Sequence, residues 1–540
     1  MKITGAQAMV KCLEEEGISL LFGYPGVAIC PFYDSVYGSS LKNILVRTEQ
    51  NAGHAANGYA RVTGKPAVCV VTSGPGATNL ITALATAYMD SIPLIAISGQ
   101  VPSDQLGSDV FQEVDITGSA EPFTKYSYLV KDAKDIPRIF KEAFHIASTG
   151  RPGPVLIDVP MDIQNQLIDF DEYPKEVNIR GYKPNVKGHV MQIKRVAKAI
   201  EDAKQPVICV GGGIFSSKAQ DKLREFCEKL SIPVISTMMG IGALPTEHPL
   251  YFGMLGSSGK GYANRALNES DLLIIIGARV ADRAVTNPRL VEEDTVTVHI
   301  DIDPAEIGKI MGTNIPIVGD AGKVLDQILK NEIKCDNREW ISTLNKWKEQ
   351  MTKFKEDREG YVNPAKFISK LSEKLDEDVI YVADVGQNQL WSANNHIVRK
   401  GRFFTTGGMG TMGYSIPAAM GAKAAAPDRQ VIAVCGDGSF QMSFMELATI
   451  VQFGIKIKII IMRNTYLGLV REFQHNKMED RFMAVSLEGS PDFGILSSAY
   501  GIPFIRVKDM NEMDQSIEKF IEEKGSCIME LNIYPFEVTQ

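Results

Sequence analysis

The sequence predicts an α/β protein with three doubly wound parallel-sheet domains. The chain has 540 residues, of which 44% are hydrophobic, so it is long enough for about three domains with separate cores. Short apolar runs alternate with helical stretches, which is typical of strands buried on both faces of a parallel sheet. Glycine-rich or polar turns follow several runs, at the sheet edge where such folds bind ligands. We expect the domains to comprise residues 1–170, 189–340 and 360–540.

The first domain alternates strands with helices, and a helical stretch at residues 52–61 follows its second strand. A polar segment with two prolines, residues 171–187, indicates a linker to the second domain. The strands predicted in the first domain are 20–22, 44–46, 67–71, 93–98 and 154–158.

The second and third domains continue the alternation of strands and helices. A charged, helix-like stretch at residues 331–359 separates them. The third domain repeats the rhythm of the first, so we expect these two domains to hold the two ends of one ligand. The predicted strands are 207–210, 234–237, 272–276 and 297–300 in the second domain, and 431–434 and 457–462 in the third.

Charge and cysteine usage argue against nucleic-acid and membrane partners. The net charge is -8, and the chain contains no basic block. No apolar run reaches the roughly 18 residues that a membrane helix needs, and the N-terminus does not resemble a signal peptide. The eight cysteines are scattered without a Cys-x-x-Cys pair, as in a reducing cytosol. We therefore expect a cytoplasmic protein.

The most informative pattern joins Asp437 and Asn464, each of which follows a predicted strand. A carboxylate, an amide oxygen and a loop carbonyl, that of Tyr466, would meet there as the hard ligands that Mg2+ takes together with phosphate oxygens. Glycines on both sides of Asp437 let a diphosphate approach, and a helix starting near Gln441 would direct its amides at the anion. This pairing resembles the thiamine diphosphate signature. The alternative is an ordinary Gly-Asp-Gly turn with an unrelated Asn.

A second candidate is Glu49, which lies between the strand 44–46 and the helical stretch 52–61. Thiamine diphosphate chemistry needs one carboxylate at N1′ of the aminopyrimidine, and we expect an apolar wall around it. The alternative is a glutamate that stabilises the dipole at a helix N-terminus.

Seven motifs together resemble the acetohydroxyacid (acetolactate) synthase large subunit, in the same order along most of the chain. They are Phe22-Gly23-Tyr24-Pro25-Gly26, Glu49-Gln50, the run from His54 to Arg61, the run from Thr72 to Asn79, Asp384-Val385-Gly386-Gln387, the run from Gly407 to Gly413, and the run from Gly436 to Met442.

The resemblance implies a thiamine diphosphate-dependent transferase that decarboxylates pyruvate and transfers the hydroxyethyl unit to a second 2-keto acid. That acceptor is pyruvate or 2-ketobutyrate, in the first step of branched-chain amino acid biosynthesis. The first domain would bind the pyrimidine, the third the diphosphate and Mg2+, and the second FAD without a redox role. Sites shared between subunits imply a homodimer or homotetramer, with a small regulatory subunit as a further candidate partner.

The resemblance also assigns residues to these roles. Glu49 and Gln112 would be catalytic, with Gln112 orienting the acceptor, and Asp437, Asn464 and Tyr466 would bind the metal. For Gln112 the alternative is a surface glutamine, and for Met412, the expected prop under the bent cofactor, it is a core methionine. The residues expected to contact thiamine diphosphate are Tyr24, Pro25, Gly26, Glu49, Gly74, Asn79, Gly386, Gln387, Met409, Met412, Gly436, Gly438, Ser439, Leu467 and Gly468. Those expected to contact FAD are Arg151, Gly212, Gly213, Thr237, Met254, Gly277, Arg279, Asp301 and Asp320.

Several positions depart from the family pattern. Val280-Ala281-Asp282-Arg283 replaces the usual Phe-Asp-Asp-Arg beside the flavin, and Val27 and Met161 replace a glycine and a lysine. Phe473 replaces a tryptophan that helps select 2-ketobutyrate, and Arg463 replaces the first of two asparagines. Val27, Met161 and the altered flavin segment keep one alternative open, a related 2-keto acid decarboxylase or carboligase with another acceptor. A separate alternative is a catalytically silent member that acts as a binding or assembly subunit.

Overall fold

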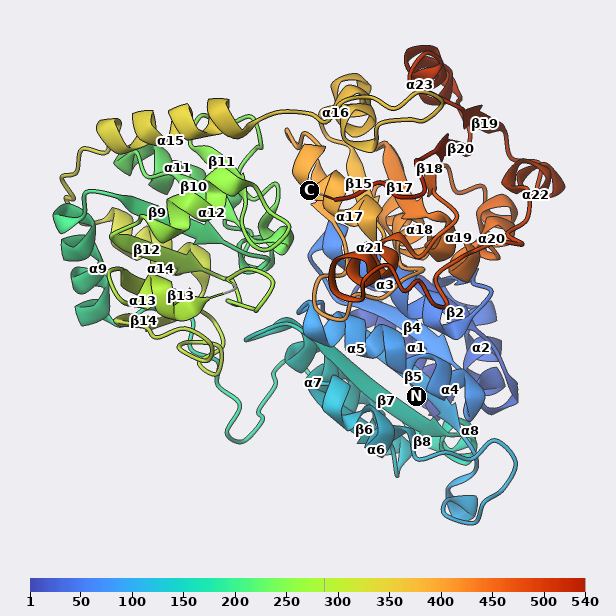
Figure 1. The fold of residues 1–540 in the computed structure, drawn as a ribbon. Coiled ribbons are helices and arrows are strands. Elements are labelled where there is room, and N and C mark those ends of the chain that lie inside the picture. The colour runs from blue at the N-terminus through green and yellow to red at the C-terminus, as the bar shows by residue number, and fades with distance from the viewer. Residues whose placement is uncertain (286, 540) are drawn as a thin grey trace.

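Three six-stranded parallel sheets form the framework of the protein (Figure 1). The computed structural model describes residues 1–285 and 287–539. The strands β4 (Ala67–Val71) and β12 (Leu272–Ile276) are buried at every position, because helices cover both faces of their sheets. The predicted fold class is confirmed.

The first sheet has the strand order β3-β2-β4-β5-β7-β6. Outside it, β1 (Lys2–Thr4) pairs antiparallel with β8 (Leu167–Asp169), which ties the start of this domain to its end. The other strands are β2 (Leu20–Tyr24), β3 (Lys42–Leu45), β5 (Leu94–Gln100), β6 (Tyr126–Leu129) and β7 (Pro154–Pro160). The helices are α1 (Gly5–Glu15), α2 (Cys30–Tyr37), α3 (Glu49–Thr63), α4 (Pro75–Asn79), α5 (Ile81–Met89), α6 (Ile116–Ala120), α7 (Ile136–Ser148) and α8 (Met161–Asn165).

The second sheet has the order β11-β10-β9-β12-β13-β14 and forms the separate green lobe of Figure 1. Its remaining strands are β9 (Pro206–Val210), β10 (Val234–Ser236), β11 (Tyr251–Met254), β13 (Val296–Asp301) and β14 (Ile315–Val318). Its helices are α9 (Val190–Asp202), α10 (Gly213–Ser216), α11 (Gln220–Leu230), α12 (Gly261–Asn268), α13 (Pro288–Glu292), α14 (Ala321–Leu329) and α15 (Arg338–Met351). Trp340, Leu344 and Trp347 of α15 pack into the core of this lobe, so its packing continues beyond residue 340.

The third sheet has the order β16-β15-β17-β18-β20-β19. Its strands are β15 (Ile380–Ala383), β16 (Arg402–Phe404), β17 (Val431–Gly436), β18 (Lys458–Arg463), β19 (Phe504–Val507) and β20 (Cys527–Asn532). Its helices are α16 (Pro364–Lys374), α17 (Gln387–Asn395), α18 (Ser415–Ala425), α19 (Asp437–Ser443), α20 (Glu446–Phe453), α21 (Gly468–Lys477), α22 (Phe493–Ala499) and α23 (Met513–Glu522).

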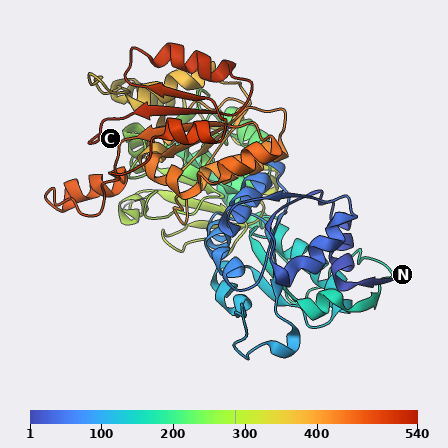
Figure 2. The same cartoon turned by 90° about the vertical axis from the view of Figure 1, so that its right-hand side faces the viewer.

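Helices α3 and α18 join the first and third domains, and residues from both sheets share one hydrophobic core (Figures 1 and 2). The two helices cross at glycines: a Cβ at Gly58 would overlap the carbonyl of Ala418, and one at Gly421 would overlap the carbonyl of Ala55. Buried Glu446 of α20 accepts hydrogen bonds from the backbone amide of Arg47 at 2.8 Å and from Asn51 Nδ2 at 2.9 Å. Close backbone approach therefore fixes how the two sheets sit relative to each other.

The predicted strands are present, with ends that differ by a few residues. Two helix starts were predicted wrongly. Helix α3 begins at Glu49 rather than at Ala52, because the Thr48 hydroxyl accepts from the amide of Asn51 and caps the helix there. Helix α19 begins at Asp437 rather than near Gln441, because the acidic side chain is favourable in a helix's first turn. Within residues 1–285 and 287–539, no helix has the length and apolarity needed to cross a membrane.

Candidate active site

Glu49 is the first residue of α3, at the carboxyl edge of the first sheet. Its Oε2 accepts a hydrogen bond from Asn79 Nδ2 at 3.0 Å, which fixes the carboxylate. Gly76 approaches closely, since a Cβ there would lie 3.3 Å from Glu49 Oε1. The side chain of Glu49 is half-buried in the single chain.

The loop after β2 meets the loop after β4 beside Glu49. A Cβ at Gly26 or Gly76 would collide with the side chain of Thr72, so both glycines are needed for this packing. Thr72 opens one of the seven motifs but was not predicted as a site residue, and its buried hydroxyl lacks a hydrogen-bond partner among the described residues. Tyr24 and Pro25 are exposed on the same loop.

Gln112 lies against the same loops through its backbone. Gly74 has a φ of +58°, and a Cβ there would lie 2.9 Å from Gln112 Cβ. Gln112 itself has a φ of +61°, in the left-handed region. Its neighbour Phe111 is 86% exposed, so this segment presents an apolar side chain to the outside of the single chain.

A buried acid supports that segment from inside the sheet. Asp158 of β7 is 1% exposed and accepts hydrogen bonds from Ser98 Oγ at 2.6 Å and Gln100 Nε2 at 3.0 Å. Gln100 Nε2 also donates to the carbonyl of Val114 at 2.9 Å. Burial raises the pKa of Asp158 to about 7. The sequence signal for this network is an acid within an otherwise apolar strand, and Asp158 was not among the predicted site residues.

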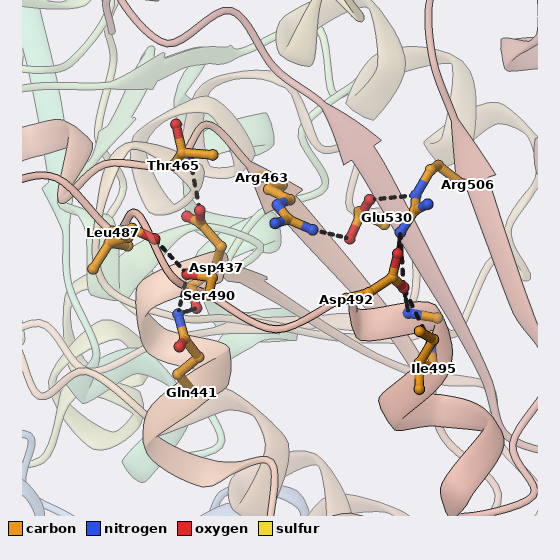
Figure 3. A network of polar contacts seen from close by, with 11 residues as sticks. Asp437, Gln441, Arg463, Thr465, Leu487, Ser490, Asp492, Ile495, Arg506 and Glu530 are labelled. Atoms are coloured by element: carbon orange, nitrogen blue, oxygen red, sulfur yellow. Dashed lines mark hydrogen bonds and ion pairs between the residues drawn. The ribbon is translucent and has the colours of Figure 1, made fainter.

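Asp437 and the loop after β18 meet at the carboxyl edge of the third sheet (Figure 3). Asp437 is 1% exposed, and its Oδ2 accepts from the backbone amide of Thr465 at 2.8 Å. Burial raises the pKa of Asp437 to about 6, although the Thr465 hydrogen bond and the charge of Arg463 oppose the rise. A buried carboxyl that is costly to ionise favours binding a compensating cation.

The structure brings the three predicted metal ligands together. Asn464 Oδ1 accepts from the backbone amide of Tyr466 at 3.1 Å, and Thr465 between them has a φ of +62°. Asn464 Nδ2 donates to Gln387 Oε1 at 3.0 Å. Gln387 therefore holds the nitrogen of the Asn464 amide, and the oxygen faces the backbone of the loop that contacts Asp437.

The side chain of Gln387 is engaged by protein groups. Besides accepting from Asn464, it donates through Nε2 to Glu472 Oε2 at 2.7 Å and to the carbonyl of Glu537 at 2.7 Å. Both amide hydrogens are used, so in this structure Gln387 orients Asn464 and offers no free donor to a diphosphate. Its neighbour Gly386 has a φ of +131°, which a side chain would disfavour, and stands at the start of α17.

Met412 lies beside the glycine loop of Asp437. A Cβ at Gly438 would be 3.1 Å from Leu467 Cδ2 and 3.5 Å from Met412 Cε, so these apolar side chains flank the glycine. Asp384, which follows β15, holds the Met412 loop by accepting from the amides of Gly413 at 3.0 Å and Ser415 at 2.7 Å.

The remaining predicted contacts of this region lie on the same loops. Ser439 Oγ donates to the carbonyl of Val385 at 3.3 Å, which joins α19 to the loop before Gly386. Gly468 is packed against Gln387 and Asn464, whereas Met409 is exposed. Gly436 is the last residue of β17.

Glu49 and Asp437 form two separate half-sites in one chain. Across the described ranges, no hydrogen bond or ion pair links Glu49, Asn79 or Gln112 to Asp437, Asn464 or Gln387. The exposed face of the Glu49 half-site is apolar at Val27 and Phe111.

A cleft of about 1110 Å³ lies between the second domain and the other two. All nine residues predicted to contact FAD line it: Arg151, Gly212, Gly213, Thr237, Met254, Gly277, Arg279, Asp301 and Asp320. The cleft also reaches Leu469, Val470 and Phe473 of α21, so it opens toward the third domain.

The charged groups of the cleft differ in their partners. Arg151 forms ion pairs with Asp303 at 3.3 Å and Glu306 at 2.7 Å, so its charge is already compensated. The guanidinium of Arg279 has no hydrogen-bond or ion-pair partner within the described part of the chain, and Arg279 lies in the cleft wall. Burial raises the pKa of Asp301 to about 6.

Comparisons with known proteins agree with this arrangement of the sheets. Three family models of thiamine pyrophosphate enzymes match: the N-terminal binding domain over residues 3–119, the central domain over 193–328, and the C-terminal binding domain over 384–531. The chain is 44% identical to a probable acetolactate synthase large subunit of Methanocaldococcus jannaschii, covering 99% of this chain and 92% of that protein. It is 45% identical to the acetolactate synthase large subunit of Corynebacterium glutamicum, and the match covers 96% of this chain and 84% of that protein. It is 42% identical to the acetolactate synthase large subunit of Lactococcus lactis, and the match covers 97% of this chain and 92% of that protein.

Proposed function

This chain belongs to the acetolactate synthase large subunits, a family of thiamine pyrophosphate enzymes, and we propose that its activity resides in the two half-sites around Glu49 and Asp437. The enzyme decarboxylates pyruvate and transfers the hydroxyethyl unit to a second 2-keto acid, pyruvate or 2-ketobutyrate. This transfer is the first step of branched-chain amino acid biosynthesis.

The observation that carries this assignment is the pair of half-sites at the carboxyl edges of two sheets. When bound, thiamine diphosphate supplies a nucleophilic carbon and accepts the electrons left by decarboxylation. Glu49, held by Asn79, is placed to hold a proton at the ring nitrogen of the pyrimidine. Gln112 is placed beside Gly74 of the same loops to orient the acceptor keto acid.

The donor set around Asp437 fits Mg2+. We propose that Asp437 supplies a carboxylate, Asn464 its amide oxygen and Tyr466 its backbone carbonyl, with phosphate oxygens completing the shell. The buried carboxyl of Asp437 and the Asn464 amide oriented by Gln387 support this role. Gly436, Gly438 and Ser439 leave room for the diphosphate at the first turn of α19.

FAD is proposed for the cleft of the second domain. Its size, the glycines at the start of α10 and the cation of Arg279 fit a diphosphate-bearing cofactor. Arg151 contributes less than the sequence suggested, because Asp303 and Glu306 already neutralise it.

We also propose a homodimer or homotetramer in which Glu49 of one subunit faces Asp437 of another. The location of the half-sites in different domains and the exposed Val27 and Phe111 support this arrangement. A small regulatory subunit is a further proposed partner. The eight free cysteines suit the reducing cytoplasm, where we place the enzyme.

The test is to incubate the purified protein with pyruvate, thiamine diphosphate and Mg2+, and to quantify acetolactate and acetaldehyde in the same reaction. Acetolactate is the expected main product. Acetaldehyde without acetolactate would replace the proposal with a 2-keto acid decarboxylase. Sedimentation velocity of the same sample measures the assembly, and a purely monomeric active enzyme would refute the shared site.

A further inference from the structure

Arg463 places a positive charge directly before the metal-ligand loop. It is the last residue of β18 and directly precedes Asn464. Its charge acts on Asp437, which lies across the same sheet edge. An arginine here can compete with a divalent cation for the Asp437 carboxylate, unless another group restrains it.

Glu530 of β20 provides that restraint (Figure 3). Its carboxylate is 4% exposed, and Oε2 accepts from Arg463 Nη1 at 3.1 Å. The register explains the contact: Glu530 pairs with Ile461, two residues before Arg463, so all three side chains lie on one face of the sheet. Phe493 closes the other side, with its ring centroid 5.0 Å from the Arg463 guanidinium carbon.

A second arginine completes the charge balance around Glu530. Arg506 of β19 pairs with Glu530 in the sheet and donates from Nε to Glu530 Oε1 at 2.7 Å. Arg506 Nη2 contacts Asp492 at 3.1 Å, and Asp492 caps α22. Two arginines and two carboxylates therefore cancel, and Glu530 is the only one of the four that contacts both arginines.

The stretch before Asp492 also contacts the metal loop. The amide of Leu467 donates to the carbonyl of Val485 at 2.8 Å, and that of Leu487 donates to the carbonyl of Thr465 at 2.8 Å. Gln441 Nε2 donates to Ser490 Oγ at 3.0 Å, which ties this stretch to the helix of Asp437. The segment that ends at Asp492 therefore links the ion pairs of Glu530 and Arg506 to the loop of the proposed metal ligands.

We propose that Glu530 is a positioning residue of the divalent-cation site, which holds the guanidinium of Arg463 away from Asp437 so that a cation can bind there. The proposal rests on the cation site assigned to Asp437, Asn464 and Tyr466. It predicts that Arg463 is tolerated only while the Glu530 side chain is in place to pair with it. Loss of Glu530 leaves the half-buried Arg463 without this ion-pair partner, while its charge still acts on Asp437.

The experiment compares Glu530→Gln with the double variant Glu530→Gln/Arg463→Met. Isothermal titration calorimetry measures the Mg2+ dependence of thiamine diphosphate binding, and activity assays give the half-saturating Mg2+ concentration separately from kcat. Glu530→Gln is expected to weaken Mg2+ binding by roughly 10- to 100-fold, as for other residues that orient metal ligands, with a smaller change in kcat at saturating Mg2+. The double variant is expected to return within about threefold of the original protein, because the competing cation is gone.

A matched control removes a paired carboxylate elsewhere. Glu142 of α7 contacts Arg138 at 3.1 Å and Tyr128 Oη at 2.9 Å in the first domain, so Glu142→Gln should leave Mg2+ binding unchanged. Should Glu530→Gln fail to fold, Arg463→Met alone tests the same idea, since it keeps the Glu530 and Arg506 pair. It is expected to bind Mg2+ within about threefold of the original protein.

Three results would overturn the proposal. These are normal Mg2+ binding in folded Glu530→Gln, an equal loss in the double variant, or a loss above about tenfold in Arg463→Met. A different failure, in which the original protein shows no Mg2+-dependent binding of thiamine diphosphate, refutes the proposed cation site itself.

Discussion

Replacing Asp158 by Asn should remove a pH dependence from the stability of the first sheet. Burial holds the pKa of Asp158 at about 7, against an ordinary value of 3.8. Between these two pH values the folded protein keeps a proton that the unfolded chain has lost. The stability contributed by this group is therefore fully present below pH 3.8, falls as the pH rises, and is lost by about pH 7. Each pH unit corresponds to about 1.4 kcal/mol, so the total over this interval is about 4 kcal/mol.

Asparagine suits the site because it imitates the neutral acid. Its carbonyl can accept from Gln100 and its amide can donate to Ser98, the two groups that contact Asp158 now. The variant should therefore keep the support of Val114 and of the Gln112 segment. Relative to the original protein, it gains stability as the pH rises toward 7.

The assay is hydrogen exchange, read by mass spectrometry on peptides from β5 and β7, with both proteins compared at each pH. The ratio of variant to original protection should rise about tenfold per pH unit between about pH 5 and about pH 7, and then level off. A ratio that stays constant across this range would show that Asp158 is ionised in the folded protein and would refute the reasoning. Exchange in β12, in the second sheet with its own core, serves as the internal control and should not change.

Three further predictions concern the half-sites and the domain contact. Glu49→Gln should lower kcat for acetolactate formation by at least about 100-fold while thiamine diphosphate still binds in calorimetry, because only the proton-holding group is lost; near-normal turnover would contradict its role. Asp437→Asn should abolish Mg2+-dependent cofactor binding in the same assay, and binding that no longer needs Mg2+ would contradict the ligand assignment. Gly421→Ala should cost about 1–3 kcal/mol in thermal unfolding, since its Cβ overlaps the backbone of α3, whereas Gly38→Ala, with open space around it, should cost less than about 0.5 kcal/mol.

The sequence by itself determined the three sheets and the edge at which the metal ligands meet. Runs such as β12 are apolar at every position, so the strands are visible in the chain without knowledge of their neighbours. Parallel strands end at one edge of a sheet, so the order of β17 and β18 along the chain was enough to bring Asp437 near Asn464. The motifs around Glu49 were found for the same reason, because they follow strands of one sheet.

Only the tertiary structure decided which groups hold these residues in place. The carboxylate that restrains Arg463 comes from β20, and its reach depends on the register between β18 and β20, which local sequence does not encode. Gln387 was expected to face the cofactor, yet its amide is taken by Asn464, Glu472 and Glu537, since the C-terminal segment folds back against α17. Such contacts join residues far apart in the chain, and only packing in three dimensions selects among them.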